Sequence, residues 1–426
     1  MKRYDTYKDS GVQWLGEIPG HWGCVPIRRI AYVNPTRTKN LDIDSYVGYA
    51  PMERIRCDNM NPSKIKVSKL TSGLTYCEEG DIVLAKVTPC FENGNLAIVP
   101  QVEQGCCYAS SELFVFRAKG KVMPRFLLYT FLNRGFINAG ASTMRGTGGL
   151  KRVTTEFANS AATPLPPLSE QHSIVSYLDD KCGKIDEWVT KKQKEVEHLQ
   201  ELKQRVIADA VTRGLNPHVK MKATNIPWLK EIPEHWEVLR NKSILRLTDE
   251  KVGNRNDLNL LSLTKQGVII RDLSEGKGKF PKDFETYLVV RPNNLVFCLF
   301  DIDETPRTVG LVRNYGMLTG AYTNFEVNED IVLPEYVYCY YLQIDDVKGL
   351  RPYYTGLRKV VKTNTFLQLR MPVPPLSEQR SIVSYLDAKC AKIDKLITNI
   401  TKEIECIKEY KQRLISDVVK GQIKVC

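Results

Sequence analysis

The stretch Pro166–Asp186 reads PPLSEQHSIVSYLDDKCGKID, and Pro374–Asp394 reads PPLSEQRSIVSYLDAKCAKID. With the two residues before each stretch included, 19 of 23 positions are identical at an offset of 208 residues. A second repeat precedes each copy, since Trp14–Trp22 reads WLGEIPGHW and Trp228–Trp236 reads WLKEIPEHW. Internal repeats predict equivalent structural units. We therefore expect a chain made of two halves of one design.

Each PPLSEQ copy is interpreted as the start of a long helix. The prolines end the preceding segment, the serine is a good N-cap, and the glutamate lies in the first turn, where the helix dipole favours a negative charge. The residues predicted to act in this structural, helix-capping role are Pro167, Ser169 and Glu170 in the first copy and Pro375, Ser377 and Glu378 in the second.

An apolar seam follows each motif in alternating steps of four and three residues. In the second copy it comprises Leu386, Cys390, Ile393, Ile397, Ile400, Ile404, Ile407, Lys411, Leu414 and Val418. In the first copy it comprises Leu178, Cys182, Ile185, Val189, Lys192, Val196, Leu199, Lys203, Val206 and Ala210. Such a seam predicts a coiled coil, here between the two helices, and a two-fold relation between the halves would make them antiparallel. The alternative is two independent amphipathic helices, each packed on its own domain.

The regions between the repeats, about 31–163 and 245–371, share little sequence identity but have similar patterns. Apolar runs predict strands in both; they lie at 81–87, 95–100 and 112–118 in the first region and at 294–300, 308–314 and 324–329 in the second. A helix is expected from Pro124 and another from Pro334. The predicted fold class is α+β, with two pseudo-repeated α+β domains separated by two long antiparallel coiled-coil helices.

A glycine with basic neighbours closes each variable region, in GTGGLKRV (146–153) and TGLRKVV (355–361). We align Gly149–Val153 with Gly356–Val360. Glycine permits close backbone approach, and neighbouring Arg and Lys side chains reach phosphates or guanine edges. The candidate DNA-binding residues are Arg145, Lys151, Arg152, Arg358 and Lys359. The alternative is an ordinary solvated turn.

Composition narrows the class of protein. The chain has 426 residues, 42% of them hydrophobic and 26% charged, which is typical of a globular protein. We find no run long enough to span a bilayer and no secretory signal, and the twelve cysteines, without a C-x-x-C pair, are expected to be reduced cytosolic thiols. The net charge of +12 favours a polyanionic partner. Counting charges in the two helical segments leaves about +10 outside them.

Motifs for catalysis are not found. The sequence has no Asn-Pro-Pro-Tyr or Asp-Pro-Pro-Tyr, no phosphate loop and no H-E-x-x-H. His21 and His235 recur beside tryptophans, and we expect packing or capping from them before catalysis. The tryptophans of these segments are expected to anchor the chain to the domains instead of stacking on bases. The acidic cluster around Asp301 and Asp303 is interpreted as a solvated loop, with a nuclease metal site as the alternative.

The paired PLPPLSEQ and PVPPLSEQ blocks, the paired WL-x-EIP-x-HW segments and the alternation of variable and repeated regions resemble the specificity subunit of type I restriction–modification systems. The resemblance covers essentially the whole chain. It implies two target recognition domains, each reading one half of a split DNA site, and spacer helices that set the gap and dock other subunits. The implied segments are a target recognition domain at 1–163, a spacer helix at 164–215, a second target recognition domain at 216–371 and a spacer helix at 372–426.

The same resemblance implies the partners of the chain. These are double-stranded DNA, two modification subunits that methylate adenine with S-adenosylmethionine, and restriction subunits that use ATP and magnesium. The chain itself is expected to be non-catalytic, without a metal or cofactor, and to act in the cytoplasm away from membranes.

Two other functions are weighed against this one. The first is a site-specific methyltransferase or nuclease fragment, and the second is a coiled-coil adaptor that binds no DNA. The helix length is compatible with a spacer, because 178–210 spans roughly 48 Å as an α-helix while half-sites one DNA turn apart are separated by about 34–36 Å. On this view, four residues added to both helices would lengthen the gap.

Overall fold

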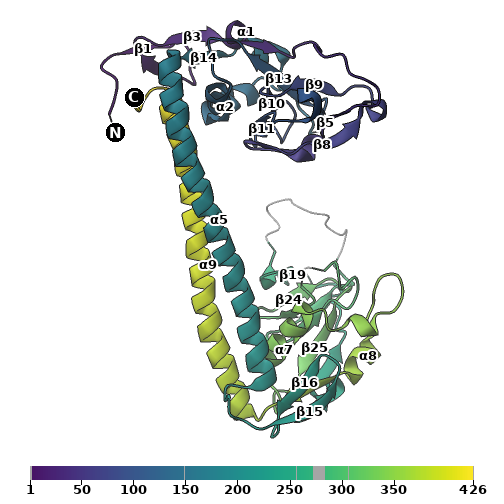
Figure 1. Ribbon diagram of the computed structural model, residues 1–426. Helices are drawn as coiled ribbons and strands as arrows, with labels where there is room; N and C mark the ends of the chain where they lie inside the picture. Colours follow the sequence, from purple (N-terminus) through teal and green to yellow (C-terminus); the bar gives the residue numbers. More distant parts are fainter. Residues whose placement is uncertain (1, 148, 256, 272–283, 306, 426) are drawn as a thin grey trace. The chain divides into compact units, whose positions relative to one another are not determined.

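Two units emerge from the internal contacts of the chain, which is described here as a computed structural model (Figure 1). Unit 1 comprises the residues up to 193 and from 402 onward, and unit 2 comprises 194–401. This division into two units does not test the four segments predicted from the sequence, so their bounds stay a prediction. The described residues are 2–147, 149–255, 257–271, 284–305 and 307–425.

Unit 1 contains the strands and short helices of the first variable region and its flanks. Its strands are β1 (Tyr7–Asp9), β2 (Glu17–Pro19), β3 (Gly23–Pro26), β4 (Ala31–Val33), β5 (Tyr46–Ala50), β6 (Ile55–Arg56), β7 (Asn59–Met60), β8 (Ser63–Lys66), β9 (Thr75–Glu78), β10 (Ile82–Ala85), β11 (Leu96–Ile98), β12 (Cys106–Ala109), β13 (Leu113–Ala118) and β14 (Ala162–Leu165). Its short helices are α1 (Ile27–Ile30), α2 (Pro124–Leu132), α3 (Arg134–Ala141) and α4 (Thr155–Ser160).

Unit 2 contains the corresponding elements of the second region. Its strands are β15 (Met221–Ile226), β16 (Leu229–Pro233), β17 (Glu237–Arg240), β18 (Leu245–Thr248), β19 (Leu261–Thr264), β20 (Gly267–Ile270), β21 (Leu288–Val290), β22 (Leu295–Phe297), β23 (Val309–Leu311), β24 (Gly316–Leu318), β25 (Thr323–Val327) and β26 (Arg370–Val373). Its short helices are α6 (Asn241–Ile244), α7 (Pro334–Asp346) and α8 (Thr363–Gln368).

One antiparallel sheet occurs in both units with the same strand order, β11-β10-β13-β4 in unit 1 and β23-β22-β25-β18 in unit 2. Its inner strands are apolar runs buried on both faces, as in β10 and β22. All six strands predicted from these runs are confirmed, and so are the helices α2 and α7 with proline at their first position. The α+β class is therefore confirmed.

The units differ beside this shared sheet. Unit 1 adds a four-stranded sheet of order β8-β5-β12-β9, in which β5 and β12 are parallel. In the described part of unit 2, the corresponding strands form the pairs β19–β20 and β21–β24. The shared sheet supports two unlike second layers, so the structural difference between the units lies beside a common sheet.

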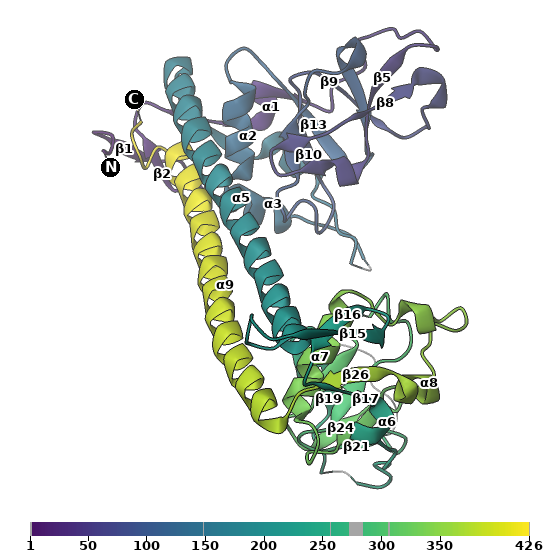
Figure 2. The ribbon, with the colours of Figure 1, turned by 60° about the horizontal axis from the view of Figure 1, so that its bottom comes forward.

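Two long helices complete the units, α5 (Leu168–Arg213) and α9 (Leu376–Val419), and they lie side by side in both views (Figure 1, Figure 2). In unit 1 the start of α5 and the end of α9 share one hydrophobic core, which includes Leu178, Leu414 and Trp22. In unit 2 the end of α5 and the start of α9 share the core that includes Trp236. Every predicted seam position is buried or half-buried, so the mutual pairing of the helices is confirmed.

Ion pairs fix the direction of this pairing. Lys411 Nζ lies 2.7 Å from Asp186 Oδ2 in unit 1, and Lys203 Nζ lies 2.7 Å from Asp394 Oδ1 in unit 2. Because α5 advances from the shared core toward Asp186 while α9 runs from Lys411 back toward that core, the helices are antiparallel. The lysines occupy seam positions and reach outward with their ammonium groups, as long cationic side chains do.

The same repeat offset of 208 residues relates the two aspartates, Asp186 and Asp394, and the two lysines, Lys203 and Lys411.

Within the part of the chain described here, no helix has the length and apolar character needed to cross a membrane. The eleven described cysteines are free thiols.

Candidate nucleic-acid interface

The basic glycine loops are β-hairpins that occupy the same place in both units. Hairpin 1 (145–152) is closed by two backbone hydrogen bonds between Arg145 and Arg152, and hairpin 2 (355–360) by two between Thr355 and Val360. Each directly precedes the short helix α4 or α8. Gly149 and Gly356 have φ of +81° and +71°, a conformation that favours glycine. Gly148 lies outside the described residues.

The alignment of the two loops predicted from the sequence is wrong by one residue at its C-terminal end. Val153 and Val361 are the buried valines that lead into α4 and α8. Val153 N–H donates to the carbonyl of Lys86, and Val361 N–H donates to that of Leu299. Val153 therefore corresponds to Val361 and not to Val360. The cause is the hairpin length, because six residues separate the closing pair in hairpin 1 and four in hairpin 2.

Three of the five candidate DNA-binding side chains are engaged in ion pairs. Arg152 forms two 2.8 Å hydrogen bonds with Glu112, and these lower the pKa of that carboxyl group. Arg358 binds Asp301 Oδ2 at 2.7 Å, and Lys359 Nζ lies 3.2 Å from Asp303 Oδ2. The side chains remain exposed, by 48% in Arg152 and 69% in Arg358. A phosphate would have to compete with these carboxylates.

The other two candidates, Arg145 and Lys151, are in a different situation. Among the described residues neither has a carboxylate within ion-pair distance. Both belong to hairpin 1, so this hairpin has cations available to a phosphate backbone. That these five residues bind DNA stays a prediction.

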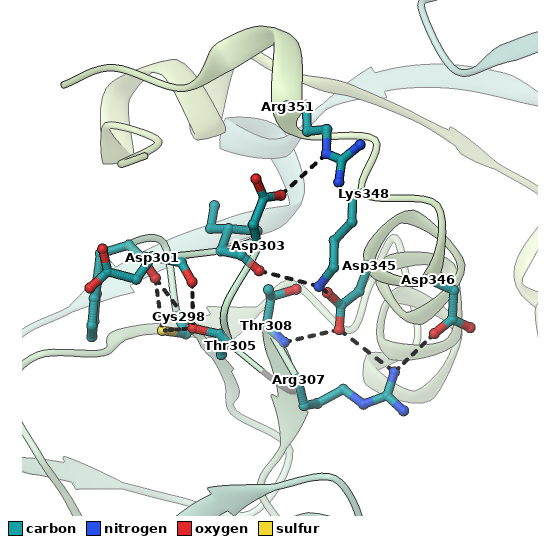
Figure 3. A network of polar contacts seen from close by, with 12 residues as sticks. Cys298, Asp301, Asp303, Thr305, Arg307, Thr308, Asp345, Asp346, Lys348 and Arg351 are labelled. Atoms are coloured by element: carbon teal, nitrogen blue, oxygen red, sulfur yellow. Dashed lines mark hydrogen bonds and ion pairs between the residues drawn. The ribbon is translucent and has the colours of Figure 1, made fainter. Parts of the chain in front are cut away.

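The acidic cluster of unit 2 is tied to cations of its own unit (Figure 3). Asp303 accepts from Arg351 Nε at 3.2 Å. The buried Asp345 accepts from the Thr308 N–H at 3.0 Å and lies 2.8 Å from Lys348 Nζ. Among the described residues no group of three or more His, Cys, Asp or Glu side chains is arranged to hold a metal ion. Asp301 and Asp303 therefore lie in a loop, but ion pairs with Arg358, Lys359 and Arg351 hold them, so the loop is more constrained than the solvated loop expected from the sequence.

Burial also changes the acidity of a neighbouring group. It raises the pKa of Asp346, although Arg307 opposes the shift. Arg307 Nη1 lies 3.4 Å from Asp346 Oδ1 and 3.6 Å from Asp345 Oδ2, so one guanidinium group bridges both carboxylates (Figure 3). This network holds the loop after β22 against the end of α7, and the same loop binds hairpin 2 through Asp301.

The two repeated motifs meet at Glu170, a contact that local sequence rules did not predict. Its carboxylate accepts from Trp22 Nε1 at 3.0 Å and Tyr4 Oη at 2.8 Å, and lies 2.6 Å from His21 Nε2. Burial alone would raise the pKa of Glu170, but hydrogen bonds from these three side chains lower it below its ordinary value. The glutamate therefore joins the first helical turn to the tryptophan segment.

The second copy repeats part of this arrangement. His235 Nε2 lies 2.7 Å from Glu378 Oε2, and Trp236 is fully buried. Among the described residues the Trp236 Nε1 group has no hydrogen-bond acceptor, unlike Trp22 Nε1. Both tryptophans are packed in the core as anchors, and each histidine contacts the glutamate of the PPLSEQ motif in its own unit.

The predicted N-caps are wrong by two positions. The helices begin at Leu168 and Leu376, so Ser169 and Ser377 lie inside the first turn. The first helical hydrogen bonds run from Gln171 N–H to the Pro167 carbonyl and from the corresponding glutamine to Pro375, each at 3.0 Å. Proline needs no hydrogen-bond partner for its own nitrogen, so the prolines occupy the cap position and the serines are displaced into the helix.

The glutamines of PPLSEQ connect each long helix to the short helix of its own unit. Gln171 is fully buried, accepts from the Met123 N–H at 2.8 Å and donates to the carbonyls of Lys121 and Pro166. Met123 is the N-cap of α2. Gln379 makes the equivalent bonds, accepting from the Leu333 N–H at the start of α7.

A half-exposed apolar patch lies on the helix pair in each unit. In unit 1 it includes Trp188 of α5 and Tyr410 of α9, beside a groove of about 220 Å³. In unit 2 the repeat-equivalent residues are Leu396 and Leu202, which are 50% and 46% exposed. The patches are equivalent in position and unlike in side chains.

Residues 19–198 match the family model for the type I restriction modification DNA specificity domain. The chain is 33% identical over 178 residues to the specificity subunit of the type I restriction enzyme EcoAI from Escherichia coli, a match that covers 40% of this chain and 30% of that protein.

Two further proteins resemble the chain over nearly its whole length. The putative type I restriction enzyme MjaX specificity subunit of Methanocaldococcus jannaschii is 24% identical, and the match covers 96% of both chains. A chain in a solved structure of a type I restriction–modification system, studied for complex assembly and conformational transition, is 18% identical, with a TM-score of 0.71 over 95% of this chain and 99% of that one. At 18% identity, the likeness to the solved structure shows only that the two chains share a fold.

Proposed function

We propose that this chain, a member of the family of type I restriction–modification specificity subunits, recognises a split DNA sequence for partner subunits that perform the chemistry. The observation that carries the proposal is the doubled design, in which the same sheet and the same PPLSEQ contacts occur in both units while the second layers differ. Two recognition domains that share a fold but differ in surface are suited to two different DNA half-sites.

The proposal assigns each variable region to one half-site. Sequence-specific readers present unlike side chains to the DNA grooves while phosphate contacts fix their position. Hairpin 1 supplies the cations Arg145 and Lys151, and hairpin 2 supplies Arg358, which is also held by Asp301. The excess of about +10 outside the helices supports an electrostatic attraction to the DNA backbone.

The modification subunits are proposed to dock on the helix pair. Two equivalent patches support two copies, one at Trp188 and Tyr410 and one at Leu202 and Leu396, because exposed apolar side chains at equivalent positions mark protein interfaces. The partners, and not this chain, would use S-adenosylmethionine for methylation and ATP with magnesium for restriction. The complex would act in the cytoplasm, where the DNA is.

Exchange of residues 31–163 for the same region of another specificity subunit tests the proposal. We expect one half-site to change and the other to stay the same, because unit 1 alone would be altered. Sequencing of methylated DNA from cells that express the hybrid with its modification subunits reads both half-sites at once. The unexchanged chain with the same partners is the control.

Two results would contradict the proposal. One is a hybrid that leaves both half-sites unchanged or alters both. The other is methylation or cleavage of DNA by the purified chain alone with S-adenosylmethionine and magnesium, which would make it an enzyme. An adaptor without DNA binding predicts no change of target in any hybrid.

A further inference from the structure

Each hairpin presents a leucine to solvent near its tip. Leu150 in hairpin 1 is 58% exposed, and Leu357 in hairpin 2 is 103% exposed, so the unit covers none of its side chain. Full exposure of a large aliphatic side chain is unfavourable relative to burial, because its apolar surface stays in contact with water. The same exposed residue type at the same place in two diverged domains points to a ligand that covers it.

The backbone beside each leucine is clamped by the loop that follows an inner strand of the shared sheet. The carbonyl of Lys151, which follows Leu150, accepts from the Thr88 N–H at 2.9 Å. The carbonyl of Arg358, which follows Leu357, accepts from the Asp301 N–H at 2.8 Å. Thr88 comes after β10 and Asp301 after β22, so the two clamps are equivalent.

Side-chain contacts reinforce both clamps. In hairpin 1 the Thr88 hydroxyl donates to the Gly149 carbonyl at 2.8 Å and accepts from the Lys151 N–H at 3.0 Å, which secures the chain on both sides of Leu150. In hairpin 2 the Arg358 guanidinium group binds Asp301 and lies 5.2 Å above the Phe300 ring. The leucines are therefore held in place by bonds that leave their own side chains uncovered.

We infer that Leu150 and Leu357 are wedges that enter the base stack of bound DNA, one in each half-site. This inference rests on the proposed function and identifies residues within it. DNA-binding proteins insert leucine and other apolar side chains between base steps, which unstacks and kinks the duplex. A single apolar side chain on a clamped hairpin, followed directly by a cation that can reach a phosphate, has the shape and chemistry for this insertion.

The cations at the hairpins favour DNA over a protein as the occupant. Lys151 and Arg358 directly follow the two leucines, and Arg145 lies at the base of hairpin 1. A protein-docking patch is usually depleted of charge at its centre, whereas each of these leucines lies between a glycine and a cation, of which Arg358 is also paired with Asp301. Flexible pyrimidine–purine steps unstack most easily, so each half-site is expected to contain such a step under its leucine.

The test uses the assembled complex of the chain with its modification subunits on DNA. Methylation sequencing with the wild-type chain first locates both half-sites. Oligonucleotides with 2-aminopurine at successive steps then report unstacking by increased fluorescence on binding. We expect Leu150→Ala to remove the increase in the half-site of unit 1 only, Leu357→Ala to remove it in the half-site of unit 2 only, and each to weaken the Kd about ten-fold.

Matched variants separate the wedge from a structural effect. Ile43→Ala in unit 1 and Leu247→Ala in unit 2 remove similarly exposed side chains, 64% and 49% exposed, away from the hairpins. We expect neither to change fluorescence or affinity. Leu150→Met and Leu357→Met keep an apolar wedge and should retain most of the signal. All six variants should unfold at the wild-type temperature, because the deleted groups are exposed.

The failures of the two proposals are distinguishable. If no split methylated site is found, the proposed function fails. If the split site is found but no step gains fluorescence with the wild-type complex, or the alanine variants bind within two-fold of wild type, the wedge is overturned and the proposed function stands. Loss of modification subunits from Leu150→Ala or Leu357→Ala without DNA would also overturn it, because the leucines would then contact a protein.

Discussion

Single residues of the PPLSEQ motif make the contacts that unite each unit. The glutamate holds the tryptophan segment and the glutamine holds the short helix, both from the first turn of the long helix. A hydrogen bond to a charged group contributes about 1.5–3 kcal/mol, and a buried amide left unpaired costs about as much. The motif is repeated because both units need the same two contacts.

Glu170→Gln should destabilise unit 1 by about 1–3 kcal/mol at pH 7, since the amide keeps the shape but loses the charge that His21, Trp22 and Tyr4 satisfy. The folded state lowers the pKa of Glu170, so the charge stabilises the fold above the ordinary pKa of 4.5 and ceases to do so as the pH falls through the lowered value. Denaturant unfolding at several pH values measures this difference.

Glu187→Gln is the control for that experiment. Glu187 is exposed on the same helix, and its variant should match the wild type at neutral pH. The difference in unfolding free energy between the wild type and Glu170→Gln should be constant above about pH 5 and shrink below it. A difference that grew toward acid would contradict the role given to the carboxylate.

At the scale of single residues, the sequence correctly predicted only those features that depend on neighbouring residues. Proline and glutamate at the start of a helix are correctly placed by propensity, but Ser169 was not the cap, because the second proline already closes the first turn. The partners of Glu170 lie about 149 residues away, and no spacing rule reaches that far. A repeat of tryptophan, histidine and glutamate in both halves was the one signal that could have linked them.

At the scale of elements, the helix pair combines an apolar seam with two charged pairs. Lys411 is 21% exposed and Asp186 61% exposed, so solvent weakens their attraction. Packing of the seam supplies most of the stability, and the ion pairs favour one register and direction. The seam was predictable because its period is local, whereas the partner of each lysine depends on the antiparallel arrangement.

Lys411→Glu should lower the stability of unit 1 by about 1 kcal/mol or less, because it places two negative charges opposite each other at a largely solvated site. Adding Asp186→Lys should recover most of the loss. Thermal unfolding at low and at 1 M salt measures both variants, and the effect should diminish at high salt. Lys408→Glu, an exposed position on the same helix, serves as the control. An unrecovered double variant would show that the pair does not form.

At the scale of elements, the strands could be predicted from the sequence, whereas the ion pairs of the hairpins could not. Buried apolar runs predicted six of the eight strands of the shared sheets, because burial on both faces of the inner strands leaves a continuous pattern. The ion pairs of Arg152 with Glu112 and of Arg358 with Asp301 depend on strands and loops brought together by the fold. A basic loop in a sequence therefore overstates the charge that is available to DNA.

At the scale of the whole molecule, the proposed function makes the helix pair a spacer. Insertion of seven residues between Gln193 and Lys194, together with seven between Thr401 and Lys402, keeps the seam in phase and leaves each ion pair inside its own unit. At a rise of 1.5 Å per residue this adds about 10.5 Å, or about three base pairs. Methylation sequencing should find both half-sites unchanged and the gap about three base pairs longer.

An insertion in α5 alone is the control, because it breaks the register against α9 and should impair folding of the complex. If the matched double insertion folded but kept the original gap, the helices would not set the distance. The half-sites themselves are beyond prediction from this chain, since base contacts come from surface residues that differ between the two units.

Aspartate and lysine occupy the same repeat positions in α5 and α9, so each helix carries both halves of the pattern that its partner needs. Such a helix is self-complementary: a protein with one copy would meet the pattern by dimerising, and its two identical readers would require a palindromic site. Joining two copies in one polypeptide removes that requirement. Each reader is then free to diverge, and the target becomes asymmetric without any change in the scaffold.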